Sequence, residues 1–186
     1  MSLSIMQNNF LFNQEYINSK NLFDQAKGSY IYIKKRKFID LGYCAGSLLL
    51  GHNSKILKNS LDLIIKNNIS NLAYTNIYAV KLSKILKKIL PNYSKFIFCN
   101  SGTESVLNSL RICGAITNKQ KIASVVGSWH GSVDNTLFSP DKNLKPLKLS
   151  DGLSKSSKKN IIFLPYNDIE NSKKILDVHK KKLMCI

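Results

Sequence analysis

Residues 95–131 read KFIFCNSGTESVLNSLRICGAITNKQKIASVVGSWHG, and this stretch decides the fold. It begins with a short apolar segment typical of a buried strand, KFIFCN, and a polar turn, SGTE, leads into a helix predicted over 103–117. A second apolar segment, IASVVG, predicts another strand, and the turn SWHGS follows it. A strand, a helix and another strand in succession indicate a parallel βαβ unit.

The same alternation continues to the end of the sequence. We expect a polar loop over 139–160, a strand in IIFLPYND, a lysine-rich helix from 168 to about 182, and a strand that begins at LMCI. The chain is therefore predicted to be an α/β protein with a parallel sheet. Because the sequence stops within the last strand, we expect an incomplete sheet that leaves 184–186 and nearby apolar surface unpaired.

A small β-hairpin is predicted upstream of this region. YIYI at 30–33 and KFID at 37–40 are strand-like and are separated by the basic turn KKR. Residues 1–28 are polar with scattered aromatics, and an N-terminal arm or a short helix is expected there. The stretch GYCAGSLLLGH at 42–52 has too little polarity for a solvent loop, and its glycines indicate backbone packed closely against another segment.

Two amphipathic helices are expected between the hairpin and residue 95. The first is capped by Asn53 and ends near Asn67 and Asn68, and the second runs over 76–90 and is ended by Pro91. The predicted inner faces are apolar and consist of Leu57, Leu61, Ile64 and Ile65, and of Val80, Leu82, Ile85, Leu86 and Ile89. A basic amphipathic helix can also lie on a membrane, but packing on the protein's own core is the simpler explanation.

The chain has 186 residues and a formal net charge of +17, from 28 Lys and Arg against 11 Asp and Glu. Such a charge is typical of proteins that bind nucleic acid or anionic membranes. Only Arg36 and Arg111 carry the guanidinium fork that phosphate and base recognition favours; the other cations are lysines. Lys, Asn and Ile are abundant together, as coding in an AT-rich genome would produce. A solvated basic surface is therefore expected, and nucleic acid is not expected as a partner.

The remaining composition is that of an ordinary globular protein. Apolar residues make up 44% of the chain and charged residues 21%, which argues against general disorder. No apolar stretch approaches the roughly 20 residues that span a bilayer, so no membrane contact is expected. The opening sequence lacks the features of a secretory signal, and four cysteines without CxxC spacing indicate neither a disulfide framework nor a metal site. A reduced, cytoplasmic protein is expected.

The turn Asn100-Ser101-Gly102-Thr103-Glu104 is the sharpest local signal. The start of a helix exposes unpaired N–H donors and the positive end of the helix dipole. Gly102 allows a ligand to approach the backbone, and Ser101 and Thr103 add hydroxyl groups, so the turn could hold a phosphate. A plain helix cap explains the same residues without a ligand. Neither GxGxxG nor GxxxxGK is present.

The turn SWHG after the next strand shifts the balance toward a ligand site. In a parallel sheet, Trp129 and His130 would lie at the same carboxyl edge as the phosphate turn. Trp129 is the only tryptophan, and its flat ring could stack on a planar cofactor. Taken singly, Trp129 could equally fill the core and His130 could be a hydrogen-bonded loop residue.

Taken together, these segments resemble the class III aminotransferases, which are pyridoxal-phosphate enzymes of fold type I. The resemblance covers roughly residues 22–186 and is strongest for the glutamate-1-semialdehyde 2,1-aminomutase-like proteins, which share the SGTE turn, an aromatic-His-Gly turn and the PYND segment in this order. It rests on DQAKGSYIYIKKRKFIDL, GYCAGSLLLGHNSKI, FIFCNSGTESVLNSLRICGAITNKQKIASVVGSWHGSVD and FLPYND.

The resemblance implies positions for a pyridoxal 5′-phosphate cofactor. Its phosphate would be held by Ser101, Gly102 and Thr103. Trp129 occupies the position of the ring that stacks on the pyridine, where the family usually has Tyr or Phe, and His130 completes that turn. The segment 42–52 matches the part of the family that lines the substrate entrance, and this makes Ser47 a candidate for substrate contact.

The resemblance also implies what this chain lacks and how it is divided. No lysine here lies in a context that resembles the family's Schiff-base segment, so no catalytic residue is assigned. Residues 1–92 would be the arm, hairpin and helices of the small-domain and linker region, and 93–186 the first part of the cofactor-binding large domain. We expect a truncated protein, whether a gene fragment or a split gene, that is inactive alone but able to bind the cofactor weakly.

Three functions remain open from the sequence. The first is amino-group transfer with a small amine or amino acid by a class III enzyme, which in this family is a homodimer. The second is the aminomutation of a semialdehyde for tetrapyrrole synthesis, although the arm lacks the Gly-Gly-Val-Asn-Ser-Pro stretch of that branch. The third is a non-catalytic basic binding protein that retains the half-domain as a scaffold.

Overall fold

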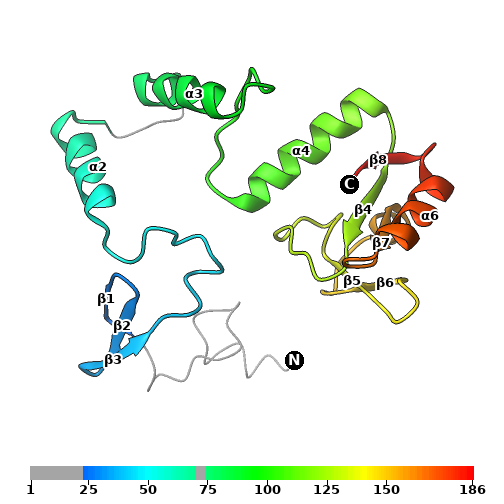
Figure 1. Cartoon of the computed structure of the whole chain (residues 1–186), viewed down its shortest axis with the longest axis horizontal. Helices are drawn as coiled ribbons and strands as arrows, with labels where there is room; N and C mark the ends of the chain where they lie inside the picture. Colours follow the sequence, from blue (N-terminus) through cyan, green and yellow to red (C-terminus); the bar gives the residue numbers. More distant parts are fainter. Residues whose placement is uncertain (1–22, 70–73) are drawn as a thin grey trace. The chain divides into compact units, whose positions relative to one another are not determined.

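The computed structural model describes residues 23–69 and 74–186 (Figure 1). These residues form two compact units, divided between Asn76 and Ile77, and each is treated separately below. Most of the arm predicted over 1–28 lies outside the described residues. The domain boundary predicted between 92 and 93 stays a prediction. Among the described residues, no helix is both long enough and apolar enough to cross a membrane.

The N-terminal unit contains a three-stranded antiparallel sheet in the order β1-β2-β3. The strands are β1 (Gln25–Lys27), β2 (Tyr30–Ile33) and β3 (Arg36–Ile39). The predicted hairpin is confirmed, and Lys34 and Lys35 turn it with φ values of 48° and 66°, as a tight hairpin turn requires. Strand β1 was not predicted, because three residues without an apolar pattern carry no strand signal.

A close backbone approach joins this sheet to the glycine-containing stretch, as expected. Gly28 and His52 exchange two backbone hydrogen bonds of 2.9 Å, and a Cβ on Gly51 would lie only 3.0 Å from the carbonyl oxygen of Gly28. The prediction that the stretch 42–52 is shielded from solvent is wrong for its leucines, because Leu49 and Leu50 are exposed. The close packing therefore involves the glycine backbone and not the apolar side chains.

Helix α2 (Lys55–Lys66) differs from its prediction at both its start and its surface. Ser54 caps it by accepting a 3.2 Å hydrogen bond from Leu57 N, and Asn53 is not the cap because its φ of 57° is left-handed. The helix ends at Asn67 as predicted. The expected inner face is not buried, because nothing within the described part of the unit covers Leu57, Leu61 or Ile65.

Helix α3 (Ile77–Ile89) matches its predicted range, and Pro91 follows it. Its expected inner face is likewise uncovered, with Val80, Leu82, Ile85 and Ile89 exposed and Leu86 half-buried. The prediction of a buried strand at 95–100 is also wrong. That segment pairs with no strand among the described residues, and Ile97 and Phe98 are exposed. An apolar sequence becomes a strand only where a partner supplies the ladder hydrogen bonds.

The parallel sheet of the C-terminal unit confirms the predicted α/β class. Its order is β7-β4-β8, and both neighbours are parallel to the central strand. Helix α4 (Gly102–Thr117) leads into β4 (Lys121–Val125), and α6 (Ile169–His179) connects β7 (Ile161–Leu164) to β8 (Leu183–Cys185). In Figure 1 the C-terminal strand lies beside α4. There Gly114 allows close approach, since its Cβ position is 3.4 Å from Met184 Sδ.

Two details of this sheet correct the sequence analysis. Leu183 and Cys185 pair with Lys121 and Ile122, so the segment 184–186 is not wholly unpaired and β8 is an edge strand with one neighbour. Helix α6 ends at His179, three residues before the predicted end, where Lys182 N donates a 2.8 Å bond to the His179 carbonyl.

The predicted loop over 139–160 contains three short elements. They are β5 (Phe138–Pro140), β6 (Pro146–Lys148) and α5 (Lys155–Asn160). Strands of three residues and a helix of six are too short to show periodicity, so they could not be recognised within this polar sequence. The hairpin matters for the core, because Phe138 packs with Leu153, Ile161 and Phe163.

The core of the C-terminal unit is small enough for one side chain to matter. We expect Ile161→Ala to lower the free energy of unfolding by about 2–5 kcal/mol, because Ile161 is 2% exposed and the cavity cannot collapse fully. Ile116→Ala is the matched control, since Ile116 is 79% exposed and should change stability by no more than about 0.5 kcal/mol. Urea denaturation of both variants measures the difference, and equal effects would contradict the assigned core.

Candidate functional site

The N-terminus of α4 is held in a capped conformation. Ser101 is extended, with φ −148° and ψ 159°, and its Oγ accepts a 3.2 Å hydrogen bond from Glu104 N. Glu104 folds back so that its Oε2 accepts a 2.6 Å bond from Asn100 N. This reciprocal arrangement is close to a capping box. These residues therefore form a helix cap, as the alternative without a ligand predicted. The cap also fixes the conformation of the turn.

The cap leaves donors free at the same place. Neither Gly102 N nor Thr103 N has a hydrogen-bond partner within the described residues. A Cβ on Gly102 would meet nothing within 4 Å, so the space beside the Gly102 Cα is open. Unpaired N–H groups at the positive end of a helix favour an anion. Ser101 accepts from Glu104 but still has its hydroxyl proton, which it could donate to a ligand.

The SWHG turn lies directly against this helix start. Ser132 N donates a 3.3 Å hydrogen bond to Thr103 Oγ1. Gly131 has a φ of 75°, and a Cβ there would overlap Thr103 Oγ1 and lie 2.9 Å from Thr103 Cα. Only glycine fits this contact, and the hydrogen bond beside it joins Ser132 to Thr103, 29 positions apart in sequence. The two turns that the sequence placed at one edge are therefore in contact.

His130 is anchored to the end of β4 by two serines. Its Nε2 lies 3.1 Å from Ser124 Oγ and 2.9 Å from Ser128 Oγ. Ser128 donates its single proton to the Val125 carbonyl at 2.6 Å, so Nε2 of His130 must be the donor in that pair. This assignment leaves Nδ1 as the ring's acceptor. His130 is a hydrogen-bonded turn residue whose ring orientation is fixed by Ser124 and Ser128.

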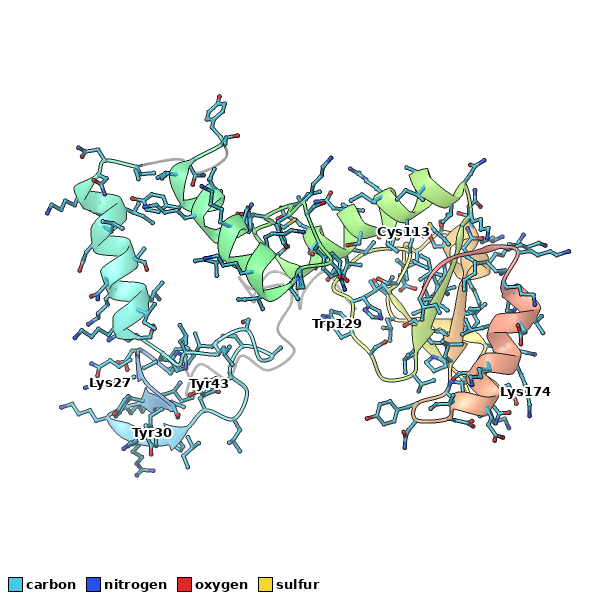
Figure 2. The ribbon with its side chains drawn as sticks, turned by 45° about the horizontal axis from the view of Figure 1, so that its top comes forward. Lys27, Tyr30, Tyr43, Cys113, Trp129 and Lys174 are labelled. Carbon is cyan, nitrogen blue, oxygen red and sulfur yellow. The ribbon has the colours of Figure 1, made fainter. Side chains whose placement is uncertain are left out.

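Trp129 is not a core residue. Its side chain is 67% exposed (labelled in Figure 2), and no aromatic or cation–π contact to it exists among the described residues. An exposed indole beside an anion-binding turn is available for stacking on a planar ligand. The assignment of Trp129 to such a role stays a prediction, as do those of Ser101, Gly102, Thr103 and His130.

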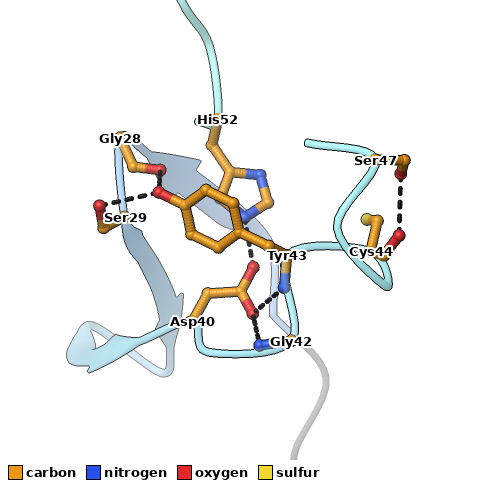
Figure 3. A network of polar contacts seen from close by, with 8 residues as sticks. All are labelled: Gly28, Ser29, Asp40, Gly42, Tyr43, Cys44, Ser47 and His52. Carbon is orange, nitrogen blue, oxygen red and sulfur yellow. Dashed lines mark hydrogen bonds and ion pairs between the residues drawn. The ribbon is translucent and has the colours of Figure 1, made fainter. Parts of the chain in front are cut away.

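Ser47 belongs to the N-terminal unit, and its role in substrate contact stays a prediction. Its Oγ donates a 2.8 Å bond to the Cys44 carbonyl (Figure 3). Tyr43, Cys44 and Ala45 have φ values of 43°, 48° and 55°, and Gly46 continues the left-handed turn at 85°. Left-handed backbone costs roughly 1–2 kcal/mol for each non-glycine residue, so other contacts must hold this turn.

Asp40 and His52 provide those contacts. Asp40 Oδ1 accepts hydrogen bonds from Gly42 N at 2.9 Å and Tyr43 N at 3.1 Å, while Oδ2 lies 2.8 Å from His52 Nε2 (Figure 3). The Tyr43 hydroxyl donates to Ser29 Oγ at 2.8 Å. The hydrogen bond from His52 is the main reason that the pKa of Asp40 lies below its usual 3.8, and the N–H group of Tyr43 adds to it.

Several of these residues could not be assigned from the sequence. Glu104 has the spacing of a capping box after Ser101, and this spacing does signal its role. No motif marks Ser124, Ser128 or Ser132: the first two bond to the His130 side chain within the turn, and Ser132 acts through its main-chain N–H group on Thr103. Asp40 and His52 are 12 residues apart, and nothing in the sequence indicates their pairing.

Comparison with known proteins places this arrangement in a family. The family model described as Aminotransferase class-III matches residues 11–184. The chain belongs to the class III aminotransferases. The family resemblance drawn from the sequence is thereby confirmed, and the SGTE and SWHG turns both lie within the matched range.

Class III aminotransferases with curated names are similar to the chain over most of its length. It is 31% identical over 169 residues to glutamate-1-semialdehyde 2,1-aminomutase of Wigglesworthia glossinidia brevipalpis, and 33% identical over 165 residues to that of Thermodesulfovibrio yellowstonii. Each match covers 87% of this chain and 38% of the relative. The chain thus spans well under half the length of the curated relatives that it matches.

Solved class III structures show the same fold. An omega-transaminase from Sphaerobacter thermophilus matches with a TM-score of 0.77 at 22% identity, covering 87% of this chain and 39% of that protein. A glutamate-1-semialdehyde aminomutase from Pseudomonas aeruginosa matches with a TM-score of 0.70 at 15% identity. This match covers 88% of this chain and 36% of that protein. The predicted partial transferase fold is confirmed, since only part of each larger structure has a counterpart here.

The contact between the two turns can be tested at Gly131. Gly127→Ala and Gly131→Ala both place alanine at a positive φ, 84° and 75°, so each should cost about 1 kcal/mol of stability. Only Gly131→Ala also overlaps Thr103, and we expect a further loss of about 1–3 kcal/mol in the free energy of unfolding. Urea denaturation compares the two variants. A Gly131→Ala variant no less stable than Gly127→Ala would disprove the contact.

The Asp40–His52 contact can be tested by titration. His52→Leu removes the main cause of the low pKa of Asp40, so this pKa should rise toward 3.8. In the native chain, the contact stabilises the fold above the pKa of an unfolded Asp and is lost as the pH falls through the lower folded value. Carboxyl-carbon NMR measures the pKa of Asp40 in the native chain and in the His52→Leu variant. Asp168 is the internal control, because its low pKa comes from Asn171, and it should not move.

Proposed function

We propose that the C-terminal unit holds the phosphate of pyridoxal 5′-phosphate and that the complete protein transfers an amino group between small molecules. The observation that carries this proposal is the contact of the SWHG turn with the helix start through Thr103. It sets two unpaired N–H groups and an exposed tryptophan on the same pair of turns. A solved transaminase with bound pyridoxal phosphate matches the chain with a TM-score of 0.78, which supports the same fold.

The residues present fit the phosphate end of this cofactor. The N–H groups of Gly102 and Thr103 and the hydroxyl of Ser101 would donate to phosphate oxygens, and the open space over Gly102 admits them. The Thr103 hydroxyl accepts from Ser132 N and can give its own proton to the phosphate. The Glu104 carboxylate is engaged in the cap, where it accepts a hydrogen bond from Asn100 N. Bound pyridoxal phosphate supplies an electron sink for chemistry at the amino-bearing carbon.

The second turn would position the cofactor ring. Trp129 would stack on the pyridine, and His130, whose Nε2 is fixed by Ser124 and Ser128, would keep the turn in one conformation. Ser47 would contact substrate from the left-handed turn of the N-terminal unit. No residue described here is assigned a bond-making or bond-breaking role, and we expect no turnover by this chain alone.

A narrower activity is favoured by the relatives. Several curated relatives at 29–33% identity are named glutamate-1-semialdehyde 2,1-aminomutase. We therefore propose aminomutation of a semialdehyde as the first activity to assay in a complete protein, and transamination of a small amine as the second. A homodimer in the cytoplasm is part of the same proposal.

The phosphate site can be tested with pyridoxamine 5′-phosphate, which has no aldehyde and so cannot react with the surface lysines. Trp129 is the only tryptophan, so its fluorescence reports binding at the turn directly. We expect pyridoxamine 5′-phosphate to quench it saturably and pyridoxamine without the phosphate to bind at least tenfold more weakly. Thr103→Val should weaken binding roughly tenfold, because a hydrogen bond to a charged group is lost.

Matched variants separate binding from folding. Thr103→Ser retains the hydroxyl and should bind within about twofold of the native chain. Ser109→Ala removes a hydroxyl on the same helix that only donates to the Ser105 carbonyl, and it should leave binding unchanged. Equal binding of pyridoxamine and its phosphate, or an unaffected Thr103→Val variant, would refute the phosphate site.

A further inference from the structure

A depression of about 470 Å³ in the C-terminal unit lies away from both turns. Its wall is formed by α4, the segment before β4, α5 and β8, and the lining residues are Leu107, Leu110, Arg111, Lys119, Gln120, Asn135, Ser156, Ser157, Asn160 and Met184. Lys119 and Gln120 come just before β4 begins, whereas SWHG follows where β4 ends. The depression is therefore at the opposite end of the central strand from the phosphate turn.

The charged side chains that line this depression are all cationic. Arg111 and Lys119 line it, and no Asp or Glu does. The ion pairs present in 23–69 and 74–186 join other residues, Asp40 with His52 and Asp177 with Lys180. Lys119 gives one N–H bond to the Lys180 carbonyl at 3.2 Å and keeps two more. An anion could thus bind both cations without displacing a carboxylate.

The amide side chains add donors beside the cations. Asn135 Oδ1 accepts a 3.1 Å bond from Ser157 Oγ, which is buried, and Gln120 Oε1 accepts a 3.4 Å bond from Asn160 Nδ2. Each side-chain oxygen is thereby bonded to a neighbouring side chain, and the NH₂ groups of Asn135 and Gln120 remain available to donate. A site that offers cations and N–H donors selects a ligand rich in acceptor oxygens.

The rest of the lining is apolar. Leu107, Leu110 and Met184 contribute hydrocarbon and thioether surface beside the cations. We infer that this depression binds a small organic anion, a carboxylate or phosphate group carried on a short apolar chain. Arg111 and Lys119 hold the anionic group, Asn135 and Gln120 donate to its oxygens, and the leucines contact the chain. This inference does not depend on the proposed function.

The test uses n-butyl phosphate and pentanoate as probes, with inorganic phosphate and n-butanol for comparison, and ¹⁵N NMR of the full chain. We expect saturable shifts of the Lys119 and Gln120 amides with at least one organic anion, several-fold tighter than with inorganic phosphate. The two anions distinguish a phosphate ligand from a carboxylate one. Shifts of Gly102 and Thr103 report separately on the phosphate turn, so the two sites are not confused.

Variants with exposed side chains keep the test independent of folding. Arg111→Gln should weaken the organic anion roughly tenfold or more, and Leu107→Ala should weaken n-butyl phosphate but not inorganic phosphate. Lys174→Gln removes an exposed lysine on α6 outside the depression and should change nothing. The inference is overturned if neither anion shifts Lys119 and Gln120 saturably, or if Lys174→Gln weakens binding as much as Arg111→Gln.

Discussion

The contact of Thr103 with Gly131 and Ser132 is the constraint on which the candidate site depends. It fixes the start of α4 against the turn that follows β4, although 29 positions separate Thr103 from Ser132. The chain returns through α4 and β4 to the start of α4, and a glycine at positive φ lets the two turns touch. If a side chain stood at 131, the helix start and the tryptophan turn would have to separate, and the free N–H groups and the exposed ring could not serve one ligand.

The two units stabilise their candidate ligand-contacting turns by different means. In the C-terminal unit, hydrogen bonds hold the turns in place. Ser101 and Glu104 cap α4, and serines bond to the His130 ring. In the N-terminal unit, the turn over 43–46 is left-handed at three non-glycine residues, and a carboxylate compensates by accepting two main-chain N–H groups while paired with His52. A strained turn that persists because its surroundings determine it is typical of ligand-contacting segments.

Local patterns in the sequence predicted what is local in the structure. The helix ranges, the hairpin, the parallel class of the sheet and the adjacency of the two turns follow from periodicity, caps and chain order. Burial did not follow, because an apolar stripe on α2 or α3 shows which face can be covered but not what covers it. The strand predicted at 95–100 failed for the same reason, since its ladder partner is not determined by its own sequence. Among site residues, the SGTE turn carried a signal, whereas the bonds of Ser124 and Ser128 to His130, and of Ser132 to Thr103, depend on how the chain folds after β4.

The two ends of β4 also show why net charge says little about binding. A charge of +17 spread over surface lysines attracts any anion weakly and is screened by salt. At the carboxyl end of β4, specificity would come from neutral N–H groups held rigidly at a helix start. At the other end, Arg111 and Lys119 would act together with the NH₂ groups of Asn135 and Gln120, whose side-chain oxygens bond to Ser157 and Asn160. In both places fixed geometry, and not the sum of charges, decides which anion fits, and this is why salt should weaken the diffuse attraction more than either site.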